Sequence, residues 1–482
     1  MYLSQILFPS ETVSHGFSDI LFEKPCAYTG EVSKGDVFFS ENGASYIKEA
    51  IEKGACAIVL DAKTALSPLE IPVFRVENVR KQYALAWARY TGHPEKSLRL
   101  IAVTGTNGKT SVSYFLSKLL QKAGYPTGLV GTVEYTDGKN RYPSDYTTPP
   151  PERLYPLLQK MKENGVTFAV MEASSHAIAQ ERLYGLTFEL AIFTNLTRDH
   201  IDYHKTWDTY KATKSSLFRN AEHSLLNLDD PSAKDMAWQA RGDVYYYGQN
   251  PSAELVIEHP LCTKYDIRYS LRIGNELLPL QIPLVGGFHI ENTAAAISAA
   301  YLMGIPKETL QSSAALLQTP TGRLERLDTD TEYDIYIDYA HTPDALKKAL
   351  TALRPHTERL TVLFGAGGDR DRGKRPEMGK VADALSDRII LTSDNPRSES
   401  PRDIIADVMR GIQGTKTLCI PDRKEAIEYA LATATAGEIL LLAGKGHETY
   451  LIDKNGKHDF SERDIVSYYL QRKGKENVSQ HE

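Results

Sequence analysis

The 482-residue chain has few cysteines, few tryptophans and no apolar run long enough to span a bilayer. Its four cysteines, Cys26, Cys56, Cys262 and Cys419, are widely separated. No pair has the spacing of a metal site or of a disulfide framework, so we expect each to be a small buried side chain. A transmembrane helix needs about 20 consecutive apolar residues, and no segment provides them.

A strong excess of charge of one sign is also missing. Lys and Arg number 56 against 62 Asp and Glu, which gives a net charge of −6. The chain therefore has no global attraction to nucleic acid or to anionic lipid. The N-terminus, Met1 to Gln5, lacks the basic start and apolar core of a secretory signal. We expect a cytoplasmic monomer that inserts into no membrane and binds no nucleic acid.

The chain is too long for one ordinary domain. Short apolar strand candidates alternate with helices, which predicts an α/β protein with mainly parallel sheets. We expect three domains, at residues 1–97, 98–327 and 328–482. The first is a small α/β domain. The second is a phosphate-loop parallel-sheet domain with a β-rich extension near residues 244–284, and the third is doubly wound and Rossmann-like.

The most informative stretch runs from Ile101 to Ser111 and reads Ile-Ala-Val-Thr-Gly-Thr-Asn-Gly-Lys-Thr-Ser. An apolar strand leads through a glycine turn into a helix predicted over residues 112–123. Such a turn directs backbone N–H groups and a helix N-terminus at phosphate oxygens. Lys109 supplies a point charge for the outer phosphates, and Thr110 supplies a hydroxyl for Mg²⁺. A full phosphate-loop motif has glycine where Val103 stands, so this stretch alone predicts only nucleoside triphosphate binding.

In the second predicted domain, three further polar residues have two interpretations each. Glu172 ends an apolar strand and is suited to hold Mg²⁺ beside the loop, although the serines that follow, including Ser174, are equally suited to cap a helix. His200 is either a metal ligand or a solvated loop histidine. Lys214 lies on a predicted amphipathic helix, and the residues alone favour an ordinary solvated charge there.

Unusual loops follow the strands of the third predicted domain. Residues 365–375 combine glycines with basic side chains, which favours an anionic ligand. Asp394 and Glu448 lie in two other strand-end loops and could bind an ammonium group, while Arg397 could bind a carboxylate with its forked guanidinium. Together these residue types predict an amino-acid site. Ordinary turns and helix caps are the alternative.

In this order, the motifs resemble those of the Mur ligase family. The resemblance is carried by Gly-Thr-Asn-Gly-Lys-Thr from Gly105, Glu-Ala-Ser-Ser-His from Glu172, Asn-Leu-Thr-Arg-Asp-His from Asn195, Tyr-Lys-Ala-Thr-Lys from Tyr210, Asp-Tyr-Ala-His-Thr-Pro from Asp338, Gly-Gly-Asp-Arg-Asp-Arg-Gly-Lys-Arg-Pro from Gly367, Asp-Asn-Pro-Arg from Asp394 and Gly-Lys-Gly-His-Glu from Gly444. The last three motifs are similar to the branch of the family that adds the third residue of the peptidoglycan stem peptide.

The resemblance implies that the three domains bind a UDP-sugar, ATP and an amino acid, in that order. It implies an ATP-dependent ligase that joins meso-2,6-diaminopimelate to UDP-MurNAc-L-Ala-D-Glu through an acyl phosphate, as a step of peptidoglycan and cell-wall synthesis. Its cofactors would be ATP, Mg²⁺ and a CO₂-derived carbamate on Lys214.

The resemblance also implies roles for individual residues. The catalytic set is Lys109, Glu172, His200 and Lys214, and the metal ligands are Thr110, Glu172, His200 and carbamylated Lys214. The ATP contacts are Gly105, Thr106, Asn107, Gly108, Lys109, Thr110, Ser111, Asn292, Arg323, Asp338 and Tyr339. The UDP-sugar dipeptide would contact Thr29, Thr147, Thr148, Ser174, Gln180 and Arg182. Diaminopimelate would contact Arg370, Asp394, Asn395, Arg397, Gly444 and Glu448.

Two departures keep alternatives open. Family members have Asp-Ser-Arg where this chain has Tyr28-Thr29-Gly30, and the loop after Phe39 is shorter. Both changes fall where the family contacts the uridine, which leaves room for a paralogue that acts on a different carboxylate. A lysine-adding ligase is a second alternative, although lysine-adding relatives lack the arginine at the position of Arg397. A non-catalytic nucleotide-binding protein is a third.

Overall fold

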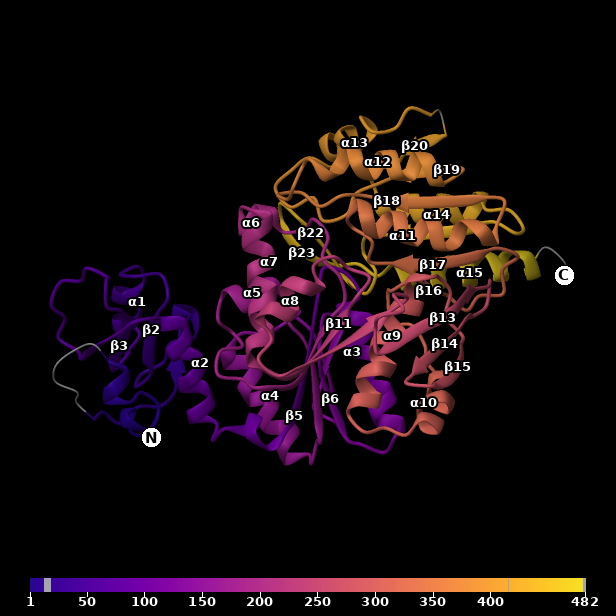
Figure 1. The fold of residues 1–482 in the computed structure, drawn as a ribbon. Coiled ribbons are helices and arrows are strands. Elements are labelled where there is room, and N and C mark those ends of the chain that lie inside the picture. The colour runs from indigo at the N-terminus through magenta and orange to yellow at the C-terminus, as the bar shows by residue number, and fades with distance from the viewer. Residues whose placement is uncertain (13–18, 415, 480–482) are drawn as a thin grey trace. The chain divides into compact units, whose positions relative to one another are not determined.

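The computed structural model describes residues 1–12, 19–414 and 416–479 (Figure 1). The chain divides into two compact units, one formed by Met1–Val256 and Ala295–Leu310, the other by Ile257–Ala294 and Gln311–Glu482. Helices and strands alternate through both units, as the alternation of apolar strand candidates predicts. Among the described residues, no helix has the length and apolar character needed to cross a bilayer.

The N-terminal part of the first unit is a four-stranded parallel sheet in the order β1-β2-β3-β4. The strands are fully or largely buried, which their β-branched and aromatic residues favour. Their bounds are β1 (Pro25–Cys26), β2 (Val37–Ser40), β3 (Ala57–Asp61) and β4 (Val73–Val76). The helices of this part are α1 (Ile47–Glu52) and α2 (Val79–Tyr90), and Asn78 caps α2 by accepting from the backbone N–H of Lys81.

The central strands of the first unit run in the order β12-β11-β10-β5-β9-β6-β7-β8. The strands from β12 to β6 are parallel, and β7 and β8 add an antiparallel edge, so the sheet is mixed. Its bounds are β5 (Arg99–Thr104), β6 (Thr127–Val130), β7 (Glu134–Thr136), β8 (Arg141–Pro143), β9 (Phe168–Glu172), β10 (Phe188–Phe193), β11 (Ala221–Asn227) and β12 (Asp243–Gly248). The parallel strands end at one edge, where the motif residues lie.

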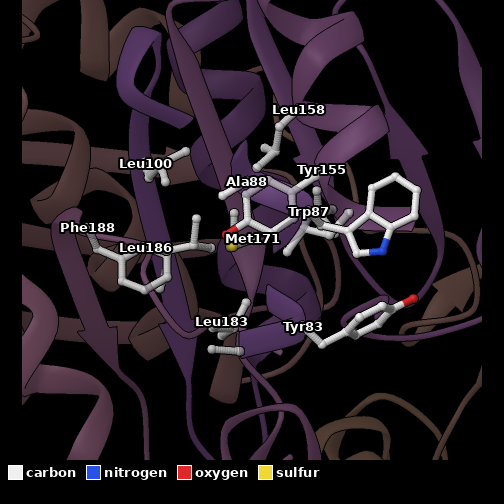
Figure 2. Packing of buried hydrophobic residues seen from close by; sticks show 14 of the residues in the cluster. Tyr83, Trp87, Ala88, Leu100, Tyr155, Leu158, Met171, Leu183, Leu186 and Phe188 are labelled. Carbon is white, nitrogen blue, oxygen red and sulfur yellow. The ribbon is translucent and has the colours of Figure 1, made fainter. Parts of the chain in front are cut away.

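Helices cover these strands through a shared apolar core. The helices are α3 (Lys109–Lys122), α4 (Pro151–Glu163), α5 (Ser175–Ala179), α6 (Ile201–His204), α7 (Trp207–Ser215) and α8 (Ala233–Gln239). Figure 2 shows Tyr83 and Trp87 of α2 grouped with Tyr155 of α4, Met171 of β9 and Phe188 of β10. Burial of large side chains of this kind contributes about 1.5–3 kcal/mol each. The helix α2 therefore shares its core with the central strands.

The second unit contains a six-stranded sheet in the order β16-β17-β21-β18-β19-β20, parallel except for β16. Alternate residues feed two separate cores: Tyr336 and Val362 enter one, whereas Ile337 and Leu363 enter the other. The first core contains residues of α11 (Pro343–Leu353), α12 (Lys374–Leu385) and α13 (Pro401–Met409), and the second contains residues of α14 (Arg423–Thr433) and α15 (Glu462–Ser479). Helices thus cover both faces, as in a doubly wound domain.

The strands of this sheet are β16 (Glu325–Arg326), β17 (Asp334–Asp338), β18 (Leu360–Phe364), β19 (Arg388–Leu391), β20 (Thr417–Cys419) and β21 (Ile439–Ala443). Two antiparallel hairpins complete the unit: β14 (Ile267–Ile273) with β15 (Glu276–Ile282), and β22 (Tyr450–Asp453) with β23 (Gly456–Asp459). The remaining elements are β13 (Leu255–Cys262), α9 (Phe288–Leu302) and α10 (Lys307–Ala314), and each of these three contributes residues to both units.

The predicted fold class is confirmed: the protein is α/β, with an N-terminal parallel sheet, a central mixed sheet and a C-terminal, largely parallel sheet. The boundaries at residues 97 and 327 stay predictions. The helix predicted over residues 112–123 begins earlier, at Lys109, because Gly108 in a left-handed conformation is already its N-cap. The expectation that every cysteine is buried is wrong. Only Cys26 is, and Cys419 is exposed because the edge strand β20 leaves it uncovered.

Stability should fall on acidification because of His289, a buried histidine near the start of α9. Burial lowers the pKa of His289 to about 3, whereas the unfolded chain takes up this proton near pH 6.5. Between these values the unfolded state binds more protons, so stability is lost as pH falls, by about 2 kcal/mol at pH 5. We expect His289→Asn, which cannot titrate, to show a smaller drop in melting temperature between pH 7 and pH 5. Equal drops in both proteins would contradict this.

Candidate active site

A glycine loop joins β5 to α3 at the carboxyl edge of the central strands. Gly105 has φ 147°, and a Cβ there would lie 1.9 Å from Oγ1 of Thr194. Gly108 has φ 88° and caps α3. Only glycine fits such a combination of left-handed backbone and close approach. The loop therefore presents backbone N–H groups and the N-terminus of α3 to one side, which is the chemistry of a phosphate site.

The loop is fixed by residues that follow β10. The N–H of Thr106 donates to the carbonyl of Asn195 (2.8 Å), and Oδ1 of Asn195 accepts from the N–H of Asn107 (3.0 Å). The hydroxyl groups of Thr106 and Tyr210 lie 3.0 Å apart. Sequence reasoning missed this bracing by Asn195, although the residue opens one of the quoted motifs. The position of Asn195 directly after a buried strand is the sequence feature that could have indicated this role.

Two lysines meet at the carbonyl oxygen of Gly105. Lys109 Nζ donates to it at 3.0 Å and to the carbonyl of Thr106 at 2.9 Å, and Lys214 Nζ donates to it at 2.7 Å. Lys214 is 1% exposed, so the interpretation of this residue as a solvated charge is wrong: α7 turns it inward against the loop. Burial, and then repulsion by Lys109, lower the pKa of Lys214 well below its usual value. This arrangement favours a neutral, nucleophilic amine.

Glu172, at the end of β9, is fully buried and lies beside the loop. Its carboxylate accepts from Thr110 Oγ1 (3.0 Å), from the N–H of Thr132 (2.7 Å) and from Thr132 Oγ1 (3.1 Å). The capping interpretation of the stretch is confirmed, because Ser174 caps α5 by accepting from the N–H of Ala177 (3.2 Å), and the role of Glu172 as a Mg²⁺ ligand stays a prediction. Sequence reasoning missed Thr132, which lies in no quoted motif.

His200 lies at the N-cap of α6 with φ 54°, an uncommon conformation for a non-glycine residue. Its Nε2 is 3.3 Å from Oδ2 of Asp199, and its ring packs edge-on against His176 with 4.8 Å between centroids. Desolvation, opposed by Asp199, lowers the pKa of His200, although the side chain is 42% exposed. Lowering the pKa favours the neutral imidazole, which is the form that ligates metals.

The predicted Mg²⁺ ligands fit a hard cation only in part. Glu172 and Thr110 offer oxygen atoms, which Mg²⁺ prefers. Among the described residues, no three His, Cys, Asp or Glu side chains gather as a metal site. A Mg²⁺ ion at Glu172 and Thr110 would complete its coordination with water, substrate oxygens or a modified side chain. A carbamate on Lys214 would supply an anionic oxygen, and it would turn the repulsion between Lys214 and Lys109 into attraction.

Four of the predicted acceptor residues, Thr148, Ser174, Gln180 and Arg182, form one hydrogen-bonded network. The hydroxyl of Thr148 lies 2.6 Å from the carbonyl of Glu172 and accepts from the N–H of Ser174 (3.1 Å). Arg182 donates to the carbonyl of Thr148 (2.7 Å) and to Oε1 of Gln180 (2.7 Å). Further members of the set lie at Thr147, whose hydroxyl is 3.0 Å from that of Thr132, and at Thr29, which begins the 3-10 helix Thr29–Glu31 in the N-terminal part.

The strand-end loops of the second unit form a separate cluster around Asn395 and Glu448. Asn395 Nδ2 donates to Glu448 Oε2 at 2.9 Å. Lys445 Nζ donates to Asn395 Oδ1 (2.6 Å), the carbonyl of Tyr450 (2.6 Å) and Glu448 Oε2 (3.3 Å), and lies 3.6 Å from Asp394 Oδ1. Lys445 is fully buried. Sequence reasoning quoted this lysine within a motif but gave it no role.

Arg397 and Gly444 lie at the same cluster. Nη1 of Arg397 donates to the carbonyl oxygens of Gly368 (2.7 Å) and Asn395 (3.3 Å), and the residue has φ 52°, a strained conformation typical of functional sites. Gly444 has φ 112°, and a Cβ there would lie 3.3 Å from Oδ2 of Asp394. Arg370 is exposed on the neighbouring loop, and its Cγ lies near Gly367. The structure thus brings the predicted diaminopimelate residues together.

Predicted ATP contacts of the second unit adjoin this cluster. Asp338 Oδ2 accepts from the N–H of Leu324 (2.6 Å), and burial raises the pKa of Asp338 to about 6. The guanidinium of Arg323 lies 4.7 Å from the ring centroid of Tyr339, whose hydroxyl is 3.4 Å from Glu448 Oε1. The fourth predicted contact, Asn292, is buried in α9.

The loop that carries Arg323 touches the loop that carries Glu448 backbone to backbone. Gly322 and Gly446 have φ 69° and 56°, and a Cβ on Gly322 would lie 2.2 Å from the carbonyl carbon of Gly446. No side chain larger than hydrogen fits there. The two loops are therefore held in direct contact.

Family models match both units at these motifs. A model described as Mur ligase middle domain matches residues 103–300, and one described as Mur ligase, glutamate ligase domain matches residues 322–446. A ligase from Caldanaerobacter subterraneus is 39% identical over 436 residues, which cover 90% of each chain. This chain belongs to the Mur ligase family. It is therefore an ATP-dependent, amide-bond-forming ligase, and the family prediction is confirmed.

Several Mur ligases that are similar to this chain have the same enzyme name. The Caldanaerobacter subterraneus enzyme and relatives from Geobacillus kaustophilus (37% identical, covering 92% of this chain and 94% of theirs) and Clostridium tetani (34%, covering 98% and 99%) are UDP-N-acetylmuramoyl-L-alanyl-D-glutamate–2,6-diaminopimelate ligases. A solved structure of a ligase of that name has 31% identity and a TM-score of 0.66, covering 94% of this chain and 95% of its own. Mycobacterium tuberculosis folylpolyglutamate synthase, at 16% identity and a TM-score of 0.60, covers 75% of this chain and 91% of its own, and it shares the fold alone.

Removing the hydroxyl of Thr148 should weaken both the fold and acceptor binding in this Mur ligase. Thr148→Val leaves the buried carbonyl of Glu172 and the N–H of Ser174 without a partner, which costs about 1–3 kcal/mol. We expect a lower melting temperature and a higher KM for the carboxylate substrate. Thr148→Ser keeps the hydroxyl and should behave like the wild type. Loss in Thr148→Ser but not in Thr148→Val would mean that the methyl group, not the hydrogen bonds, matters.

Proposed function

We propose that this Mur ligase joins meso-2,6-diaminopimelate to the D-glutamyl carboxylate of UDP-MurNAc-L-Ala-D-Glu in peptidoglycan synthesis. The observation that carries the proposal is the cluster in which Arg397 donates to the carbonyl of Asn395, the Asn395 amide donates to Glu448, and Lys445 links Asp394 to the same network. Two carboxylates and one guanidinium complement an ammonium and a carboxylate on the same carbon. The names of the similar ligases support the same amino acid.

The first step of the reaction converts a carboxylate, which is a poor acyl donor, into an acyl phosphate, which is a good one. The acceptor carboxylate attacks the γ-phosphorus of ATP, ADP leaves, and an acyl phosphate forms. The amine of the amino acid then attacks the acyl carbon, inorganic phosphate leaves, and the nitrogen loses a proton. The glycine loop, the N-terminus of α3 and Lys109 neutralise charge on the migrating phosphoryl group, so positioning and electrostatics supply most of the catalysis.

The residues around Glu172 suit a magnesium ion, which would supply positive charge that lowers the repulsion between the reacting oxygens. Thr110 and Glu172 would bind one ion, and His200 with a carbamylated Lys214 would serve a second. The buried, neutral form of Lys214 is the form that reacts with CO₂, because the amine nitrogen needs its lone pair. The carbamate would then balance the charge of Lys109, with which Lys214 shares the Gly105 carbonyl.

Acceptor binding is assigned to the network of Thr147, Thr148, Ser174, Gln180 and Arg182. It connects directly to the backbone of Glu172, so a bound acceptor would lie beside the proposed metal ligand. Arg182 contributes a cation whose direction is set by two hydrogen bonds to Gln180 (2.7 and 3.1 Å). This direction favours a carboxylate or phosphate on the acceptor.

The choice of amino acid tests the proposal. Wild-type enzyme should release phosphate with UDP-MurNAc-L-Ala-D-Glu, ATP and diaminopimelate, and at least about 100-fold less efficiently with L-lysine, which leaves Arg397 unpaired. Arg397→Ala should lose at least about tenfold in kcat/KM for diaminopimelate, with little change for lysine. Arg402→Ala, an exposed arginine of α13, is the control. Equal use of both amino acids, or phosphate release without any amine, would contradict the proposal.

The carbamate gives a prediction with a spectroscopic readout. Protein equilibrated with ¹³C-labelled bicarbonate should show one carbamate carbon resonance that is absent from Lys214→Met and present in Lys211→Met. Lys211 lies on the same helix but pairs with Asp235 at 3.2 Å and is half-buried. A spectrum of the wild type that matches Lys214→Met would contradict the assignment of the modification.

A further inference from the structure

Lys445 is the most completely satisfied buried cation of the second unit's cluster. Its ammonium has three N–H groups, and three acceptors lie within 3.3 Å: Asn395 Oδ1, the carbonyl of Tyr450 and Glu448 Oε2. Asp394 Oδ1 follows at 3.6 Å. The side chain is fully buried, so these interactions are shielded from water and are strong. The proposed contacts with diaminopimelate include three of these four residues, but not the lysine.

Lys445 also determines the orientation of the Asn395 amide. Oδ1 accepts from Lys445 and from the N–H of Ile452 (2.9 Å), so the amide nitrogen faces Glu448 and donates to it. With a hydrogen bond from Asn395 and another from Lys445 on Oε2, the carboxylate of Glu448 has Oε1 directed toward Tyr339. Lys445 therefore positions the Glu448 carboxylate through Oε2 and makes no hydrogen bond to Oε1.

Arg370, the other charged residue predicted to contact diaminopimelate, is exposed and screened by water, and the remaining charges of the cluster sum to zero only because of this lysine. Asp394 and Glu448 contribute −2, and Arg397 and Lys445 contribute +2. The adjacent buried pair Arg423 and Glu462 (2.8 Å) adds nothing net. A neutral pocket with both signs of charge matches a group that carries one ammonium and one carboxylate. Without Lys445 the pocket has a net charge of −1 and matches a lone ammonium instead.

We propose that Lys445 is a specificity-determining residue: it orients Asn395 and Glu448 and cancels one negative charge, so that the pocket selects a zwitterionic end group over a lone ammonium. The inference rests on the proposed function, since the two amino acids compared are diaminopimelate, which ends in a zwitterion, and lysine, which ends in an ammonium. Arg397 attracts the extra carboxylate, and Lys445 removes the advantage that a bare cation would otherwise have.

The experiment measures kcat/KM for diaminopimelate and for L-lysine in full-length wild type, Lys445→Met and Lys445→Met/Asp394→Asn. The single variant should lower the diaminopimelate-to-lysine ratio by at least about tenfold, mainly through a higher KM for diaminopimelate. The double variant restores a net charge of zero and should recover most of the ratio. Lys457→Met is the control, because Lys457 lies exposed over the ring of Tyr450 (3.9 Å) outside the buried cluster.

A merely structural role for Lys445 predicts a different pattern. Both amino acids would then lose efficiency equally, and the double variant would be no better than the single one, which would overturn the inference. If Lys445→Met does not fold, as its melting curve would show, Lys445→Gln keeps donors for Asn395 and Tyr450 without the charge and is read in the same way. Failure of the wild type to use diaminopimelate would overturn the proposed function instead, whatever the variants do.

Discussion

The carbonyl oxygen of Gly105 is the point on which the phosphate loop depends. Two lysines from different helices, Lys109 and Lys214, donate to this one oxygen. Their mutual repulsion has to be absorbed by a low pKa, by an anionic ligand or by modification of one amine. A low pKa removes one of the two positive charges, whereas an anionic ligand or a modified amine compensates them, and an anionic ligand agrees with the phosphate chemistry of the loop. The loop can hold this arrangement because Asn195 braces it from the neighbouring strand end.

The second unit also buries a lysine, Lys445, but surrounds it with oxygen atoms. These atoms are carboxylate, amide and carbonyl oxygens. In one unit a buried lysine is short of negative charge, and in the other a buried lysine is enclosed by it. The first arrangement leaves an amine open to chemistry, whereas the second locks an ammonium in place. Burial alone therefore does not define the role of a lysine, and its neighbours do.

Much of the fold was predictable from the sequence, because strand candidates such as residues 100–104 and 438–442 are largely apolar runs between helices. The grouping of Asp394, Asn395 and Glu448 also followed from their places at strand ends. Lys214 was not predictable from residue types, since an amphipathic helix gives no sign of which lysine faces inward. Thr132 and Lys445 were missed because their roles arise from contacts across 40 and 50 residues of sequence.

The close approach of Gly322 and Gly446 has a mechanical consequence. Most loops meet through side chains, whose rotamers absorb small displacements. Here backbone meets backbone, and a single added carbon would already overlap. The loop that carries Arg323 and the loop that carries Glu448 thus have no slack between them. A shift of one loop toward the other is therefore met directly by backbone, and the position of Arg323 is coupled to that of Glu448.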